Sequence, residues 1–201
     1  MMIFNELRKH GRLASKRHPM YEKNKVAKIF RYIGVAFWAG YLIFFGTTFA
    51  FGFADMVPNR EPYHVMNAVV LIFILALDFL LRVPFQKTPT QEVKPYLLLP
   101  VKRNRIIDFL LIRSGLSLFN LFWLFMFIPF SFITITKYFG ILGVFTYLIG
   151  IWLLIVANNY WYLLCRTLIN ERIWWVLLPI AFYGGLGCLA FIPEDLSLIH
   201  I

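Results

Sequence analysis

Apolar residues along this chain form five long stretches, and polar or basic residues gather in the segments between them. The stretches cover about residues 32–54, 65–84, 114–134, 138–165 and 173–193. Because the hydrocarbon core of a bilayer is about 30 Å thick, a helix needs roughly 20 apolar residues to cross it. The pattern therefore predicts an all-α membrane protein, a polytopic bundle of five transmembrane helices.

Residues 1–31 precede the first stretch and are predicted to form a cytosolic basic arm. Apolar residues recur there at helical spacing, and Gly11 and the pair His18-Pro19 interrupt the pattern. A residue before proline disfavours the helical conformation, so a helix should break at this point. We expect two short amphipathic helices on the membrane surface, followed by a transmembrane domain over residues 32–195. The alternative is a basic tail without fixed structure.

Composition and charge agree with a membrane protein and set its orientation. The chain is 60% hydrophobic, and its formal net charge is +10. Of its 20 Lys and Arg residues, only Arg60 and Lys137 fall in the predicted outer segments, and the other eighteen fall on the opposite side. Lys and Arg are enriched on the cytoplasmic side of membrane proteins. We therefore expect a multi-pass membrane protein with a cytosolic N-terminus. The charge points to anionic phospholipid rather than to nucleic acid.

Two ionisable residues stand out in the second stretch, where Arg82 follows Asp78 by one helical turn. This spacing lets the carboxylate and the guanidinium neutralise each other near the inner boundary of the membrane. An ionisable residue inside a membrane helix is a functional candidate, whereas a self-neutralising pair also suits a structural role. The sequence favours the structural role and leaves both open.

The segment of residues 85–113 is predicted to be a long inner loop with an unusual pattern. Two prolines bracket an aromatic and aliphatic stretch, and basic residues follow the second proline at once. Positive charge at a helix N-terminus opposes the helix dipole, so the basic cluster suits contact with lipid phosphate or an acidic partner. Simple anchoring of the loop on the positive side of the membrane is the alternative. The residues singled out are Pro95, Tyr96, Leu99, Pro100, Lys102 and Arg103.

Motifs of catalysis are missing from the sequence. It contains no GxxxxGK[ST] phosphate-binding run, no HExxH or CxxC motif and no GxSxG nucleophile elbow. The four histidines are dispersed, and the two cysteines, Cys165 and Cys188, lie in apolar stretches. We therefore expect no catalytic residue, no metal and no cofactor, and do not expect an enzyme.

The run PYLLLPVKRNRIIDFLLIRS at residues 95–114, continued by SLFN at residues 117–120, carries a resemblance. It resembles a family of uncharacterised bacterial membrane proteins related to type-2 ABC transporter permeases. In such permeases an inner loop carries Leu-Pro and basic residues before the next membrane helix. The resemblance extends over most of residues 1–195 and corresponds to about the first half of the family's length.

This resemblance implies a membrane subunit of an ABC-type exporter, which forms part of the translocation path. The implied partner is a separate cytosolic ATPase, contacted through inner loop 85–113. The missing C-terminal half of the same protein and a second copy, as a homodimer, are further expected partners. The main alternative is a non-transporting membrane scaffold or assembly partner, and an intramembrane enzyme acting on lipid ranks last.

The last six residues, 196–201, match the conceptual translation of a transposon end used in preparing sequencing libraries. We expect them to contribute nothing to the fold, and we expect the natural protein to continue beyond Asp195. The alternative is a genuine C-terminal tail.

Overall fold

The computed structural model describes Lys9, Leu13 and residues 25–56, 61–86, 103–117 and 119–190. Within these residues all regular structure is helical and no strand occurs, as the sequence predicts. The chain divides into two compact units, Met1–Leu42 and Ile43–Ile201. The predicted amphipathic helices of the arm lie mostly outside the described residues.

Helix α3 spans Lys25–Met56 and runs from the first unit into the second. In its second-unit part, Gly46 and Ala50 are buried. A Cβ added at Gly46 would collide with the carbonyl oxygen of Met126 and the ring of Pro129. The glycine therefore allows the backbones of α3 and α9 to approach each other, a common use of small residues between membrane helices.

The next helical run is continuous from Pro62 to Phe85 and contains three elements. They are α4 (Pro62–Val65), the π-helix η1 (Met66–Val70) and α5 (Leu71–Phe85). Pro62 occupies the first turn, where its missing N–H costs no helical hydrogen bond. Gln86 is extended and ends the run.

The segment predicted as inner loop and third span differs from expectation. Helix α7 (Arg103–Gly115) fills the end of the predicted loop. The helix then breaks at Leu116 and Ser117 and again at Trp123, so the predicted span 114–134 consists of short pieces. These pieces are α8 (Phe119–Phe122), α9 (Leu124–Phe130) and the π-helix η3 (Ser131–Ile135). Pro129 lies inside α9, two residues before the start of η3, which fits a local widening where proline removes a hydrogen bond.

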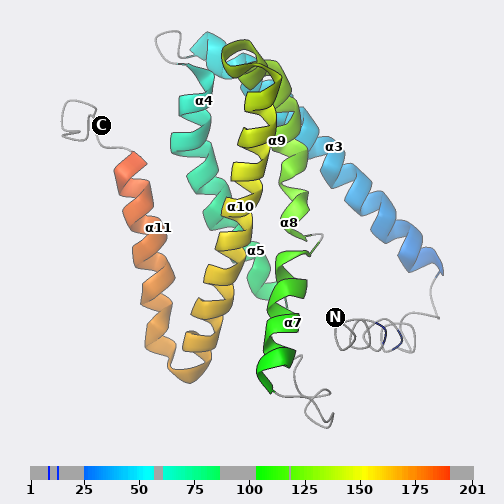
Figure 1. Cartoon of the computed structure of the whole chain (residues 1–201), viewed down its shortest axis with the longest axis vertical. Helices are drawn as coiled ribbons and strands as arrows, with labels where there is room; N and C mark the ends of the chain where they lie inside the picture. The colour runs from blue at the N-terminus through cyan, green and yellow to red at the C-terminus, as the bar shows by residue number, and fades with distance from the viewer. Residues whose placement is uncertain are drawn as a thin grey trace. The chain divides into compact units, whose positions relative to one another are not determined.

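Helix α10 (Thr136–Glu171) contains a sharp break at Gly140, whose φ of 65° and ψ of −170° are not helical. The ring of Tyr147 lies 6.4 Å from the rings of both Phe127 and Phe130. In a straight helix these residues would lie roughly 25–30 Å apart along the axis. The chain therefore folds back at Gly140, and Figure 1 shows α9 and α10 running in opposite directions. The turn predicted at residues 135–137 is helical instead, and glycine supplies the positive φ three residues later.

The loop predicted at residues 166–172 is also mostly helical, because α10 continues to Glu171. Arg172 is extended and separates α10 from the 3-10 helix η4 (Ile173–Val176) and from α11 (Leu177–Ala190). Inside the second unit, α10 packs against α5, α7, α8 and α9, and α11 packs against α5. Helix α10 is thus the central element of this unit.

Among the described residues, three helical runs are long and apolar enough to cross a membrane: Tyr32–Phe53, Pro62–Phe85 and Leu124–Glu171. The apolar helix Ile173–Cys188 is shorter. Large apolar side chains such as Phe37, Phe73 and Leu142 are exposed, as they would be toward lipid. These features are consistent with a membrane protein, whereas the five separate spans predicted from the sequence are not established.

Candidate functional site

Eight polar side chains gather inside the second unit, between the helix that ends at Phe85 and helix α10. We call them the polar cluster. Its members are Asp78, Arg82, Gln86, Ser114, Asn120, Trp123, Asn158 and Asn159. Asp78 and Arg82 come from α5 and have exposed fractions of 0%. Because a buried charge is costly unless it is paired and hydrogen-bonded, the bonding of this pair decides what the cluster can do.

All five N–H groups of the Arg82 guanidinium have acceptors. Nε donates to Asp78 Oδ2 at 2.7 Å, and Nη2 donates to Asp78 Oδ1 at 3.1 Å. Nη2 also donates to Asn120 Oδ1 at 2.8 Å. Nη1 donates to Asn159 Oδ1 at 2.9 Å and to Gln86 Oε1 at 2.8 Å. Five donors is the full capacity of arginine, so no N–H of this guanidinium remains for a ligand.

The Asp78 carboxylate is bonded to a similar extent. Besides Arg82, its Oδ1 accepts from Trp123 Nε1 at 2.9 Å, and its Oδ2 accepts from Asn158 Nδ2 at 2.8 Å. The Oδ1 of Asn158 in turn accepts from the Tyr183 hydroxyl on α11. The ion pair is therefore neutral overall and held by side chains from α5, α10 and the α8–α9 junction.

An aromatic side chain covers the pair. The ring centroid of Phe119 lies 5.0 Å from Arg82 Cζ, within range of a cation–π interaction. Phe79 and Tyr162 pack edge to face beside the cluster, with ring centroids 5.5 Å apart. These rings surround the charges with apolar surface, which strengthens the bonds inside.

A second set of bonds joins the two helices that flank residues 87–102. Gln86, just after α5, donates through Nε2 to Ser114 Oγ on α7 at 3.0 Å. The same Nε2 donates to Asn159 Oδ1 on α10 at 2.6 Å, and Asn159 Nδ2 donates back to Ser114 Oγ at 3.1 Å. Gln86, which precedes the 87–102 segment, and Ser114, near the end of the helix that follows it, are thereby attached to one point on α10.

Asn120 adds a cap to the same structure. Its Nδ2 donates to the carbonyl oxygens of Ser114 at 3.1 Å and Gly115 at 2.6 Å, which end helix α7. The last carbonyls of a helix have no partner within the helix, so this side chain satisfies the buried Gly115 carbonyl and adds to the bond from Ser117 N–H to the Ser114 carbonyl. Asn120 therefore bonds Arg82 and terminates α7 at once.

The geometry of the polar cluster suits it to holding the helices together rather than to binding a ligand. Its ionised groups are fully bonded, and no group of three or more His, Cys, Asp or Glu that could hold a metal occurs in the described part of the chain. A carrier site needs polar groups that can exchange partners with a solute. In this conformation neither Asp78 nor Arg82 has a polar group free to bind a solute.

The residues proposed for ATPase contact are not brought together by this structure. Pro95, Tyr96, Leu99, Pro100 and Lys102 lie outside the described residues, and Arg103 is the first residue of α7. Asp78 and Arg82, in contrast, form the ion pair at the centre of the cluster.

Only Asp78 and Arg82 of the polar cluster were singled out from the sequence. The other six members were not, namely Gln86, Ser114, Asn120, Trp123, Asn158 and Asn159. The available signal was their polarity, since each has a hydrogen-bonding side chain in or beside an apolar stretch. Such groups need partners inside a membrane. The sequence does not show that these side chains bond to one another and to the ion pair, because they come from separate segments.

A family model matches residues 12–198 of the chain, and its description is a family of unknown function (DUF5687). Comparison with curated proteins and with solved structures found no match.

Proposed function

The chain belongs to this family of unknown function, and from that premise we propose that it is the membrane-spanning permease subunit of an ABC-type exporter. It would form part of the translocation path and would couple to a separate cytosolic ATPase through residues 85–113. The long apolar helices and the basic residues of this segment support the proposal.

The observation that carries the proposal is that the residue before the 87–102 segment and the end of helix α7, which follows the segment, are attached to one point on α10. Gln86 at the end of α5 and Ser114 near the end of α7 meet at Asn159. A partner that displaced the end of α5 or helix α7 would therefore act on α10 through direct hydrogen bonds. Nucleotide-driven transport needs such a connection between a binding surface and the membrane helices.

The proposed topology has five membrane crossings and a cytosolic N-terminus in the bacterial inner membrane. Two observations support it: the uneven distribution of Lys and Arg, and the reversal at Gly140, which divides the longest apolar run into two arms. Anionic phospholipid would contact the basic segments. A C-terminal half of the same protein and a second copy are proposed to complete the transport path.

A non-transporting membrane scaffold is the second candidate, and the closed bonding of Asp78 and Arg82 favours it. A fully bonded ion pair suits a rigid platform that holds a partner without changing conformation. Binding of an ATPase through the apolar residues of the 87–102 segment would separate the exporter from a scaffold that only anchors this segment to lipid.

The test compares apolar and charge variants of this segment in the full-length protein. Tyr96→Ala and Leu99→Ala should each weaken binding of the cognate ATPase by about 1–3 kcal/mol, as buried interface anchors do. The matched control, Lys102→Gln with Arg103→Gln, should weaken binding less, and this smaller effect should shrink at high salt.

The measurement is co-purification with the ATPase. Membrane orientation is checked by thiol labelling of single cysteines at Asn59 and Asn104. Normal binding by the alanine variants, with lost orientation in the charge variant, would favour the scaffold.

A further inference from the structure

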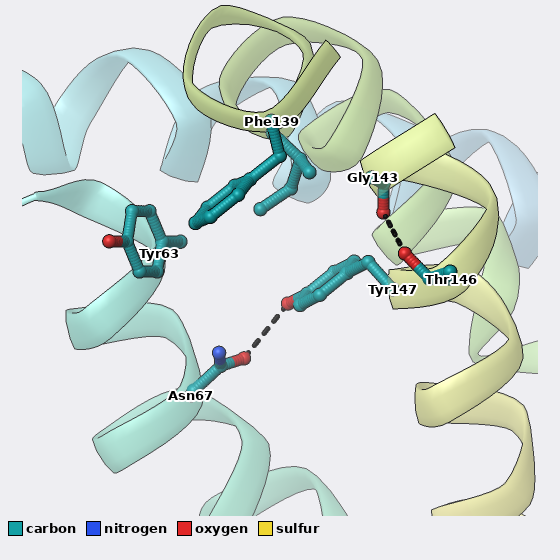
Figure 2. A pocket seen from close by; sticks show the side chains of 7 residues that line it. Tyr63, Asn67, Phe139, Gly143, Thr146 and Tyr147 are labelled. Atoms are coloured by element: carbon teal, nitrogen blue, oxygen red, sulfur yellow. Dashed lines mark hydrogen bonds between the residues drawn. The ribbon is translucent and has the colours of Figure 1, made fainter. Parts of the chain in front are cut away.

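A pocket of about 410 Å³ lies between the first turns of the Pro62–Phe85 run and the fold-back at Gly140. Figure 2 shows Tyr63 and Asn67 on one side and Phe139 and Tyr147 on the other; Asn67, Phe139 and Tyr147 are directed toward the space between them, whereas the Tyr63 hydroxyl is directed away from it. The remaining lining residues are Ile135, Gly143 and Thr146. This volume is within the usual range of small-molecule sites, about 300–1,000 Å³.

The pocket presents a hydrogen-bond donor without a partner. The Tyr147 hydroxyl donates to Asn67 Oδ1 at 2.9 Å, which fixes the amide with its Nδ2 toward the pocket (Figure 2). Within the described part of the chain, no hydrogen bond is formed by Asn67 Nδ2. Thr146 directs its hydroxyl proton to its own helix, at the carbonyls of Leu142 and Gly143. The available polar group is therefore the Asn67 amide N–H, which requires an acceptor.

The chemistry of the lining excludes a strongly charged ligand group in the pocket itself. Its residues are three aromatic, one aliphatic and three small or neutral polar, and no Lys, Arg, Asp or Glu lines it. The ring of Tyr63 lies 5.4 Å from that of Phe139, so the walls offer flat apolar surface. A neutral acceptor on an apolar body, such as an ester carbonyl on an acyl chain, satisfies both conditions.

The backbone around the pocket is irregular. Both π-helices of the described residues line it: η1 supplies Asn67, and η3 supplies Ile135. π-helical turns are frequently found at functional sites. Gly140, next to Phe139, has a positive φ, and a Cβ at Gly143 would collide with the Phe139 side chain. The pocket is therefore surrounded by irregular turns rather than by two regular helix faces.

Asn67 lies near one end of the Pro62–Phe85 run. The run has 24 residues and is about 36 Å long, so it exceeds a 30 Å hydrocarbon core by a few ångströms at each end if it is centred on the core. Asn67 lies five residues, or about 8 Å, from the Pro62 end. In that placement it is about 5 Å inside the hydrocarbon boundary, where water is scarce, an unpaired N–H is costly and the ester groups of that leaflet are the nearest acceptors.

We infer that this pocket binds an amphiphile through a neutral ester carbonyl, which accepts from Asn67 Nδ2 while its acyl chain packs on Tyr63, Phe139 and Tyr147. A membrane glycerolipid and a smaller ester-bearing molecule share this chemistry. The site does not depend on an ATPase, and it stands apart from the proposed role of residues 85–113.

The test uses competition between two lipids in one membrane. The full chain, with p-benzoylphenylalanine introduced at Phe139, is placed in nanodiscs that contain equal amounts of diacyl and dialkyl phosphatidylcholine of the same chain length. Only the diacyl lipid has ester carbonyls. Irradiation and mass spectrometry should give roughly fivefold more diacyl than dialkyl adduct, as one neutral hydrogen bond predicts.

The matched control places the same photoreactive group at Phe145, which is exposed on α10 and does not line the pocket. Its adduct ratio should be near one.

Asn67→Leu removes the donor at an exposed position and should bring the ratio at Phe139 to about one. Unchanged thermal unfolding of this variant shows that the fold is retained.

A second arm of the experiment adds methyl laurate to nanodiscs of dialkyl lipid alone. An Asn67-dependent methyl laurate adduct identifies a small ester-bearing molecule as an occupant, and Asn67 dependence with diacyl lipid alone identifies a glycerolipid. A ratio near one at Phe139 in the unmutated pocket, without an Asn67-dependent laurate adduct, would overturn the inference.

Discussion

The Pro62–Phe85 run and helix α10 touch through polar side chains at two places, and the two places differ in how completely they are bonded. Asn67 meets Tyr147 at one, and Asp78 meets Asn158 at the other. The second contact lies eleven residues further along both helices, about 16 Å away. The same pair of helices therefore carries a contact at the pocket and a contact in the polar cluster.

In the polar cluster every donor of Arg82 is used, and the carboxylate of Asp78 accepts from three residues. At the pocket a single neutral bond leaves Asn67 Nδ2 without an acceptor in the described residues. A closed network resists rearrangement, because each broken bond leaves a buried polar group unpaired. An open contact can accept a ligand at little structural cost. The comparison suggests that α10 is fixed at the polar cluster and adaptable at the pocket.

The largest expected effect follows from breaking the buried ion pair. Arg82→Met keeps an unbranched apolar side chain but leaves the Asp78 carboxylate buried without its partner. We expect the free energy of unfolding to fall by about 3–5 kcal/mol, measured by denaturant or thermal unfolding in detergent. Arg105→Met, at an exposed position of α7, should change it by less than about 0.5 kcal/mol. Equal effects of the two variants would show that the cluster does not hold the helices together.

The ion pair of Asp78 and Arg82 could be predicted from the sequence, because their four-residue spacing places them close together within one helix. The rest of the cluster could not, since Asn120 and Asn159 reach Arg82 from segments 38 and 77 residues away. Only the packing of α8 and α10 brings them there.

The all-helical class was also predictable, since long apolar stretches favour helices in lipid. The position of the fold-back was not. The gap between the third and fourth apolar stretches predicted the turn at residues 135–137, whereas the backbone reverses at Gly140, where no side chain opposes a positive φ. Hydropathy records which residues avoid water and carries no information on dihedral angles.

An intermediate effect is expected at the indole that bonds the carboxylate. Trp123→Phe removes the donor to Asp78 Oδ1 and keeps an aromatic ring, so stability should fall by about 1.5–3 kcal/mol, the range for bonds to charged groups. Trp161→Phe is the matched control, because the Nε1 of Trp161 is buried without a partner in the described part of the chain. Its replacement should cost distinctly less in the same unfolding experiment. A larger loss at Trp161 would mean that ring packing, not the bond to Asp78, sets the stability.

The smallest effect is expected at the pocket. Tyr147→Phe removes the bond to Asn67 and keeps the ring against Phe127 and Phe130, so unfolding should change by less than about 1 kcal/mol. Tyr160→Phe, which removes an exposed hydroxyl bonded to the Leu111 carbonyl, provides a comparison of the same kind. If Tyr147→Phe were as damaging as Trp123→Phe, the contrast between an open and a closed contact would fail.

The most direct test of this contrast is hydrogen exchange of backbone amides in the Asn159→Leu variant. This change removes the acceptor and donor that join Gln86, Ser114 and Arg82 on α10. We predict faster exchange at two regions that we call the flanks, residues 82–86 at the end of α5 and residues 111–117 at the end of α7, because each loses its attachment to α10. Amides around the pocket, at residues 62–70 and 141–147, should keep their rates. Unchanged exchange at the two flanks, or a uniform increase that includes the pocket, would contradict the account.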